Sequence, residues 1–409
     1  MKKIVFFVAA SLLLLPACGK IREENLKRED LTEPVPIVLT TAEQSVRNAS
    51  NDFGLDVFGK LCALSGGKDV AFSPLSLSLA FAMVTEGANE DTYRQLVNVF
   101  GWGNVTKEEL GGFYKKMISG LVTADPNVSF TSSNSLWAAP DLKLLPAYQA
   151  LLRTYFEAES YTVDFTLPAT LERINKWCSD KTDGKISRML QDLDPDLRMM
   201  LINALLFKAP WANEWTVNTG RNFRSGNATV RKDYLYASGE YRYAELADCA
   251  AVALPYSNGA YEMVVFLPKT GKTTADILPT VMKEGGALAL VSTPGEVYLP
   301  KWSTEYSTED NLIPVLKGKG LLLPFTNGAD FSGISSAEAL KISQVLQKVK
   351  IDVTEKGTEF AAVTVIGMEK ATAIISPPKP FVFDADHPFV YMIREISSNT
   401  ILLLGTLSN

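Results

Sequence analysis

A near-continuous apolar run from Met199 to Phe207 is the feature that most constrains the fold of this chain. A strand that is hydrophobic at almost every position is buried on both faces, so it belongs in the middle of a large sheet with other layers packed on either side. Asn203 interrupts the run. Because a buried side-chain amide needs hydrogen-bond partners, we expect polar groups of neighbouring elements to meet it.

Helical patterns come mainly before this run, and strand patterns mainly after it. Apolar residues at helical spacing predict helices near 53–61 and 170–178, and Ser73-Pro74 is typical of an N-cap followed by the first helical position. The residues after Pro74 are apolar on nearly every side, which indicates a helix inside the protein. Further strands are predicted at 261–267, 296–299, 341–353 and 389–393. This order indicates an α+β fold.

The stretch 46–409 reads as one domain, since no linker rich in Pro, Gly or Ser and no internal repeat divides it. The net charge is −6, with both signs interspersed along the chain. That distribution argues against a nucleic-acid-binding protein, which usually carries a basic stripe. We expect a monomer with no nucleic-acid partner.

The N-terminal segment 1–17 predicts an export signal. Lys2 and Lys3 precede an apolar stretch, 4–15, that is too short to span a bilayer. The residues that close it, Leu15-Pro16-Ala17-Cys18, resemble the lipobox of bacterial lipoproteins, which implies lipidation of Cys18. An ordinary signal peptide with an incidental cysteine is the alternative.

The stretch 18–45 is polar and reads as a flexible tether between the lipid and the domain. The protein would then be an exported lipoprotein whose only contact with a membrane is its anchor. Gly19 and Lys20 follow Cys18, which favours the outer membrane of a Gram-negative cell, on either its periplasmic face or the cell surface.

Catalytic and metal-binding chemistry finds little support in the sequence. His387 is the one histidine of the chain, and it lies before a proline and an apolar strand pattern, so we interpret it as structural. GxSxG and HExxH motifs are absent. Cys62, Cys178 and Cys249 lack CxxC spacing, which predicts reduced, buried cysteines and neither a disulfide framework nor a zinc site. We therefore expect no enzyme activity and no cofactor.

The segment 348–379 combines a strand pattern with the composition of a long loop. A strand pattern through Val353 runs into 354–359, and small and β-branched residues follow as far as Pro377. Alternate residues of an extended chain share a face. One face carries only apolar or hydroxyl-bearing side chains, from Thr358, Phe360, Ala362, Thr364, Ile366 and Met368. The segment therefore fits a sheet with one face buried, and a strand resident in the sheet is the plain alternative.

Several motifs follow one another in a set order. They are Phe72-Ser73-Pro74-Leu75-Ser76 with Glu86-Gly87-Ala88; Ile174-Asn175-Lys176-Trp177 with Thr182-Asp183-Gly184-Lys185-Ile186; 201–208 with Trp211; 327–333; 355–359; and Asp386-His387-Pro388-Phe389. Together they resemble the serpin family of serine protease inhibitors, from about Ser45 to the C-terminus. The resemblance implies helices with three β-sheets, a large central mixed sheet and an exposed reactive-centre loop.

The resemblance also implies a mechanism. A protease attacks the exposed loop as a suicide substrate, and the cleaved loop inserts into the central sheet and traps the acyl-enzyme. The hinge of this loop would be Glu355, Lys356, Gly357, Thr358, Glu359, Phe360, Ala361 and Ala362. The residues that control opening of the sheet would be Ser73, Ser76, Asn203, Gln347 and Trp211. Family spacing places the reactive bond at Ala371–Thr372, which suits elastase-like proteases, or at Lys370 after a shift of one residue, which suits trypsin-like proteases.

Two residues depart from the family pattern. Gln347 stands where many members have histidine, and it retains hydrogen-bonding capacity. Phe360 occupies a hinge position that is usually small, so it would slow insertion. A non-inhibitory serpin, acting as a binding protein or as a protease substrate, therefore stays open beside the inhibitor, and a hydrolase is the remote third reading.

Overall fold

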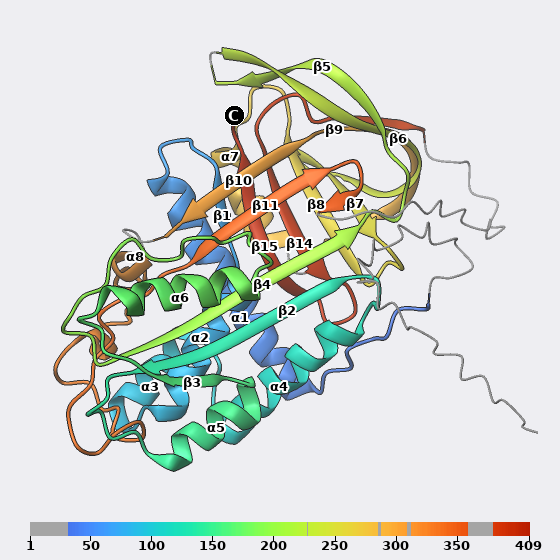
Figure 1. Cartoon of the computed structure of the whole chain (residues 1–409). Coiled ribbons are helices and arrows are strands. Elements are labelled where there is room, and N and C mark those ends of the chain that lie inside the picture. Colours follow the sequence, from blue (N-terminus) through green and yellow to red (C-terminus); the bar gives the residue numbers. More distant parts are fainter. Residues whose placement is uncertain (1–31, 227, 285–287, 309–311, 359–378) are drawn as a thin grey trace, which may run out of the picture.

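The computed structural model describes residues 32–226, 228–284, 288–308, 312–358 and 379–409. Its helices are α1 (Thr41–Leu64), α2 (Pro74–Gly87), α3 (Glu90–Phe100), α4 (Lys107–Thr123), α5 (Pro146–Phe156), α6 (Pro168–Lys181), α7 (Thr274–Glu284) and α8 (Leu312–Gly318). The helices gather in the first half of the chain and most strands follow, which confirms the α+β expectation (Figure 1).

A mixed six-stranded sheet runs through the middle of the molecule (Figure 1). Its order is β10 (Trp302–Ser307), β11 (Lys348–Thr354), β12 (Gly357–Thr358), β4 (Met199–Pro210), β2 (Ser129–Ala138) and β3 (Glu159–Thr162). All neighbours are antiparallel except β2 and β3. Helix α6 packs on the face of this sheet that is turned to the viewer, and α2 packs on the opposite face (Figure 1).

A second, nine-stranded sheet lies behind and above the first. Its members are β1 (Val70–Phe72), β15 (Thr400–Leu407), β14 (Phe389–Glu395), β8 (Tyr261–Pro268), β7 (Cys249–Tyr256), β6 (Ala228–Glu245), β9 (Val291–Pro300), β13 (Phe381–Asp384) and, paired with β6, β5 (Thr216–Ser225). The long β6 pairs with β9, with β5 and, at its end, with β7. The third sheet that we expected is thus continuous with the second through β6.

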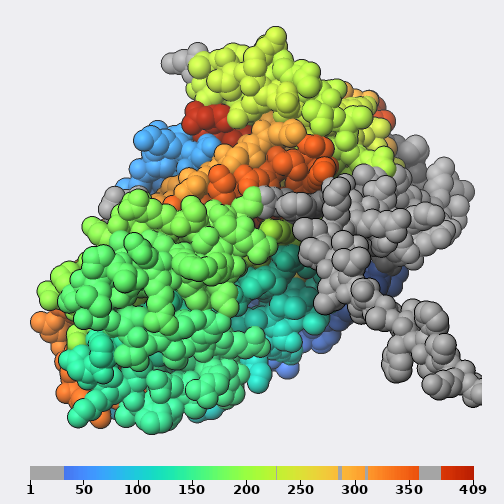
Figure 2. Space-filling model, viewed as in Figure 1, coloured from blue at the N-terminus to red at the C-terminus, as the bar shows by residue number. Residues whose placement is uncertain are grey.

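The surface view shows where the central sheet is covered. In Figure 2 the chain around α6, in green, hides most of β4, whereas β10 and β11, in orange, remain visible as a strip beneath β5 and β6. The side chains of β11 accordingly alternate between half-buried and buried.

The helix predicted after Ser73 is confirmed. The Ser73 side chain accepts a hydrogen bond from the Ser76 backbone N–H, at 3.2 Å, and Pro74 occupies the first turn. Most of α2 is buried because it runs between the two sheets, in contact with β4 and β15. A helix that is apolar on nearly every side is stable where other elements cover all of its faces, as the two sheets do here.

The strand predicted at 341–353 is too long, because β11 begins at Lys348. Loops satisfy the backbone before it. The Ile342 N–H donates to the Pro324 carbonyl at 2.8 Å, and the backbone of Gln347 bonds in both directions with Thr308. In residues 341–347 these hydrogen bonds take the place of the strand pairing that the apolar pattern predicted.

The boundary of the tether also needs correction. Helix α1 begins at Thr41, where Thr40 and Glu43 form a capping box, and Ile37 and Leu39 belong to the hydrophobic core. The packed chain therefore starts before residue 46, because apolar side chains within the polar stretch find core positions. Segments 1–17 and 18–31 lie outside the described residues.

Candidate functional site

A cluster of polar side chains joins the N-terminus of α2 to β4. The Ser76 hydroxyl donates to the Asn203 side-chain carbonyl oxygen. The Asn203 amide nitrogen donates in turn to Ser132 Oγ at 3.0 Å and to Asn134 Oδ1 at 2.9 Å, both on β2. The amide that interrupts the apolar strand is therefore satisfied on both sides, as expected.

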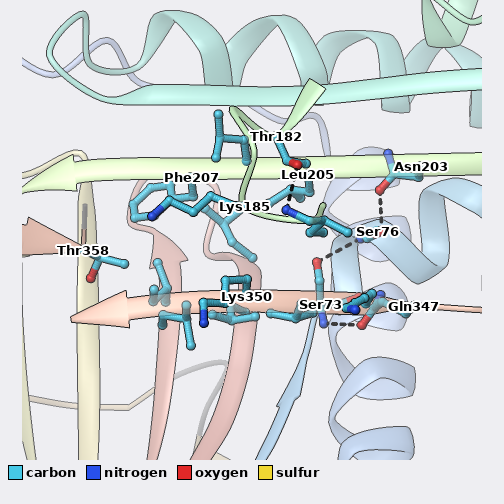
Figure 3. A pocket seen from close by; sticks show the side chains of 18 of the residues that line it. Ser73, Ser76, Thr182, Lys185, Asn203, Leu205, Phe207, Gln347, Lys350 and Thr358 are labelled. Carbon is cyan, nitrogen blue, oxygen red and sulfur yellow. Dashed lines mark hydrogen bonds between the residues drawn. The ribbon is translucent and has the colours of Figure 1, made fainter. Parts of the chain in front are cut away.

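Gln347 extends this cluster to the segment before β11. Its Oε1 accepts from the Ser73 backbone N–H at 2.7 Å, and its Nε2 donates to the Ser73 carbonyl at 2.9 Å (Figure 3). We define the polar cluster as Ser73, Ser76, Asn203 and Gln347. It ties one helix to both strands that flank the middle of the sheet.

Between β4 and β11 the sheet is open. Both strands pair antiparallel to β12, so they run parallel to each other, and within the described residues no ladder joins them directly. Leu205 and Phe207 on β4 point toward the molecular interior yet stay half-buried, whereas Leu206, on the α6 side, is buried. A core-facing residue that remains half-buried indicates that a neighbouring strand is missing.

This opening, which we call the slot, contains two cavities. One, of about 70 Å³, lies between β4 and β11 beside Thr358 (Figure 3). The other, of about 490 Å³, lies between the start of β4, α2 and residues 339–347. Ser76, Asn203 and Gln347 of the polar cluster line both, so the two cavities adjoin at the cluster and follow one another along the sheet.

The two residues of β12 occupy one end of the slot, which we call its mouth. Gly357 pairs with Pro210 and Thr354, and Thr358 pairs with Ala209 and Val353. Gly357 has φ +139°, and a Cβ there would lie 2.1 Å from the Ala209 carbonyl oxygen. Only glycine fits this close approach.

Thr358 faces the interior, as its position in the alternating pattern predicted. It is 4% exposed, and its hydroxyl lies 2.6 Å from the Tyr256 hydroxyl. Burial raises the pKa of Tyr256 well above its usual value, so the phenol remains a neutral hydrogen-bonding partner.

Trp211 lies apart from the polar cluster, which corrects its grouping with those residues. Its indole N–H donates to the Thr354 carbonyl at 2.8 Å, and its ring stacks on Tyr256 with centroids 4.5 Å apart. Glu355 next to it pairs with Lys301 at 2.6 Å, and this contact lowers the pKa of Glu355. Trp211 thus supports the hinge end of the sheet, because it follows β4 directly.

The connection after α6 crosses the outer face of the slot. Lys185 pairs with Asp352 on β11 at 3.0 Å, and Asp183 pairs with Lys208 on β4 at 2.7 Å. Burial alone would raise the pKa of Asp352, but hydrogen bonds from Ser303 and Lys185 outweigh it and hold the pKa below its usual value. Ion pairs therefore attach the connection after α6 to both β4 and β11.

Several predicted site residues lie outside the described residues. They are Cys18, Glu359, Phe360, Ala361, Ala362, Lys370, Ala371 and Thr372. Sequence reasoning also missed partners that the structure reveals: Ser132, Asn134, Thr308, Tyr256, Asp352 and Lys185. Asn134 had a usable signal, since it is a polar residue in a strand and pairs directly with Asn203.

His387 has a structural environment. Its Nδ1 lies 2.7 Å from an Asp386 carboxylate oxygen and its Nε2 lies 2.9 Å from the Pro268 carbonyl oxygen. Both ring nitrogens are engaged, which leaves neither to act as the base of a hydrolase.

Three of the four cysteines lie among the described residues. Cys62, Cys178 and Cys249 are unpaired, and burial raises the pKa of each thiol to about 12, so none is a reactive thiolate. Among the described residues, no three of His, Cys, Asp and Glu converge as metal ligands. None of the described helices is long and apolar enough to cross a membrane.

The fold and site define an α+β protein whose central sheet has a slot between β4 and β11 that, among the described residues, only β12 enters, at one end. A family model described as serpin (serine protease inhibitor) matches residues 48–409. This chain belongs to the serpin family, whose members are in general protease inhibitors rather than catalytic enzymes.

Individual relatives support this assignment. A serpin-like protein of Thermococcus kodakarensis is 31% identical over 380 residues, covering 90% of this chain and 86% of that protein. Iripin-3 of Ixodes ricinus is 32% identical over 389 residues, covering 91% and 97%. The solved structure of human thyroxine-binding globulin complexed with its hormone is similar at a TM-score of 0.79 and 25% identity, covering 90% and 99%.

Replacing Gln347 by alanine removes both of its side-chain bonds to Ser73 and leaves the buried Ser73 backbone N–H without a partner, whereas the Ser73 carbonyl still accepts from the Leu77 N–H at 3.2 Å. We expect the free energy of unfolding to fall by about 1–3 kcal/mol. Urea unfolding followed by tryptophan fluorescence measures this. Gln344→Ala, at an exposed position of the same segment, is the matched control and should change stability by less than about 0.5 kcal/mol. Equal effects of the two variants would contradict the role assigned to Gln347.

Gly357→Ala tests the close approach of the hinge to β4. The added methyl group meets the Ala209 carbonyl, and alanine disfavours φ +139°, so we expect β12 to leave the sheet and the thermal midpoint to fall. Gly112→Ala is the control, because a Cβ at this position in α4 meets no atom within 4 Å. An unchanged midpoint for Gly357→Ala would show that the hinge is not held as described.

Proposed function

We propose that this protein inhibits serine proteases as a suicide substrate whose cleaved loop inserts into the slot and traps the protease covalently. The observation that carries the proposal is the position of β12. Two residues of the proposed hinge are paired on both sides, with β4 and with β11, at the mouth of a slot whose remaining length holds no strand of the described residues. The sheet thus already pairs with Gly357 and Thr358, and the slot could accommodate the residues that follow them as one further strand.

The register of β12 specifies how insertion would continue. Each further step along the loop moves one residue back along β4 and one residue back along β11. Alternate residues would then face the interior on the side of Thr358. The successive interior pairs with β4 would be Phe360 with Phe207, Ala362 with Leu205, Thr364 with Asn203, Ile366 with Leu201 and Met368 with Met199.

The chemistry of these pairs is favourable. Ala362 is small where the slot is narrow, and Thr364 brings a hydroxyl to the polar cluster at Asn203. Ile366 and Met368 are apolar where the slot widens into the cavity of about 490 Å³. About ten new backbone hydrogen bonds at ~1 kcal/mol net each would stabilise the inserted form by on the order of 10 kcal/mol. The uninserted form would then persist through a kinetic barrier.

The reactive bond proposed from the sequence is Ala371–Thr372, with Lys370 as the alternative. Alanine suits the small pocket of elastase-like proteases, and lysine suits the acidic pocket of trypsin-like ones. We also propose that the protein is exported and anchored through lipidated Cys18. We further propose that it acts as a monomer.

A non-inhibitory serpin is the second candidate, and Phe360 favours it. The interior position opposite Phe207 borders a cavity of only about 70 Å³, so a second aromatic ring must displace neighbours before insertion can proceed. Slow insertion gives the protease time to hydrolyse the acyl-enzyme, which makes the loop a substrate. The thyroxine complex of the globulin shows that a protein of similar fold binds a small molecule.

Incubation with an elastase-like and a trypsin-like protease tests the proposal. We expect a complex that survives SDS and a higher thermal midpoint after loop cleavage. Thr358→Arg places a charge in the buried site beside Tyr256, so it should abolish the complex while cleavage continues. The exposed Lys356→Arg is the control and should inhibit as the unchanged protein does. Cleavage with neither a complex nor a rise in midpoint would refute insertion.

Phe360→Ala separates the two candidate functions. Removing the ring relieves crowding against Phe207, so the share of protein ending in complex should increase and the inhibitor consumed per protease should decrease. Val363→Ala is the control, since residue 363 would lie on the outer face of the inserted strand. If Phe360→Ala still gave only cleaved protein, slow passage of Phe360 would not be what limits inhibition.

A further inference from the structure

The first described residues form a strap across the domain. We define the strap as residues 32–40. The Val35 N–H donates to the Ala124 carbonyl at 3.0 Å, and the Ile37 N–H donates to Ser397 Oγ at 2.7 Å. Ile37 is buried where Gly120 leaves room, since a Cβ on Gly120 would lie 2.9 Å from Ile37. The strap therefore has a defined path on the surface.

The strap begins at the hinge end of the slot. The Thr32 carbonyl accepts from Asn258 Nδ2 at 3.1 Å, in the turn between β7 and β8. The preceding residue, Ser257, donates its N–H to the Pro210 carbonyl at 2.9 Å, and Pro210 pairs with Gly357. In Figure 1 the dark blue strap likewise enters beside the ends of β2 and β4. The chain thus joins the domain next to β12, where the proposed reactive-centre loop, which we call the bait, begins.

We propose that the hinge end of this protein faces the lipid surface, so that its partner is a serine protease held at the same membrane. The inference rests on the proposed lipid anchor at Cys18 and adds an orientation to it. Attachment at the opposite end of β4 would present the bait to the bulk solution instead.

Chain dimensions show why the orientation matters. Fourteen peptide steps join Cys18 to Thr32; a chain of that length spans at most about 50 Å, and a flexible chain of that length would average about 20 Å. A protease domain of about 200 residues is about 40 Å across. A soluble protease would therefore have to enter a gap that is usually narrower than itself, whereas a protease held at the membrane already lies at the height of the bait.

Energy transfer to the membrane tests the orientation directly. The full lipidated chain, carrying Cys62→Ser, is bound to vesicles of phosphatidylethanolamine and phosphatidylglycerol that contain an acceptor dye. A donor dye is attached through Lys356→Cys at the hinge end, or through Asp194→Cys before β4, both exposed positions. We expect the donor at 356 to lose more emission than the donor at 194.

Equal transfer from the two positions, or more from 194, would overturn the orientation while leaving inhibition untouched. A chain that does not bind vesicles would overturn the anchor, and this inference with it. Since neither readout requires a trapped protease, failure of the inhibitory function is detected separately, by the absence of SDS-stable complex.

Cleavage kinetics test the choice of partner. The rate at which a soluble elastase-like protease cuts the bait should be lower on vesicles than after release in detergent, and the same protease fused to a lipid anchor should cut faster on vesicles. A Gly/Ser insertion of about 60 residues after residue 24 increases the average reach to about 47 Å, more than the width of the protease, and should restore the soluble rate. A soluble rate that is the same on vesicles and in detergent would overturn the proposal.

Discussion

The backbone groups that line the facing edges of β4 and β11 are the constraint on which the rest of the structure depends. A strand edge inside a sheet presents N–H and carbonyl groups that other proteins pair, cover or expose to water. Here the described residues provide two such edges, and only β12 pairs with them, at one end. The polar cluster and the charged connection after α6 hold the two edges in position by side-chain contacts instead of a ladder.

This arrangement explains why polar residues lie in the middle of a hydrophobic layer. Asn203 bonds to α2 and to β2, and Gln347 bonds to the first turn of α2, so the same helix is attached to both sides of the slot. Side-chain bonds can exchange partners without dismantling a hydrophobic core. A sheet closed there by packed aliphatic side chains would open only at the expense of that packing.

The sequence predicted the parts of the fold that depend on local pattern. The apolar run of β4, the Ser73 cap and the buried α2 follow from periodicity and capping chemistry, and the inward face of Thr358 follows from alternation. The resemblance to serpins, and not the local pattern, implied that Asn203 and Gln347 control opening of the sheet for the segment that begins at the hinge. The start of β11, the place of Trp211 and the packing of Ile37 could not be predicted, because each depends on residues far away in the chain: Thr308, Tyr256 and Gly120.

The slot itself has no local signature in the sequence, since it is defined by the lack of a ladder between β4 and β11 among the described residues. The two cavities and the half-buried state of Leu205 and Phe207 reveal it, and local hydrophobicity cannot distinguish half-burial from full burial.

The stacking of Trp211 has a practical consequence. This indole touches Tyr256, whose hydroxyl bonds to Thr358, and it donates to the carbonyl of Thr354 just before the hinge. Entry of further residues into the sheet would alter the polarity and the hydrogen bonding around the ring. The protein therefore carries a natural chromophore at the mouth of the slot. In a variant whose other five tryptophans are replaced by phenylalanine, its emission can follow the conformational change in real time without any attached label.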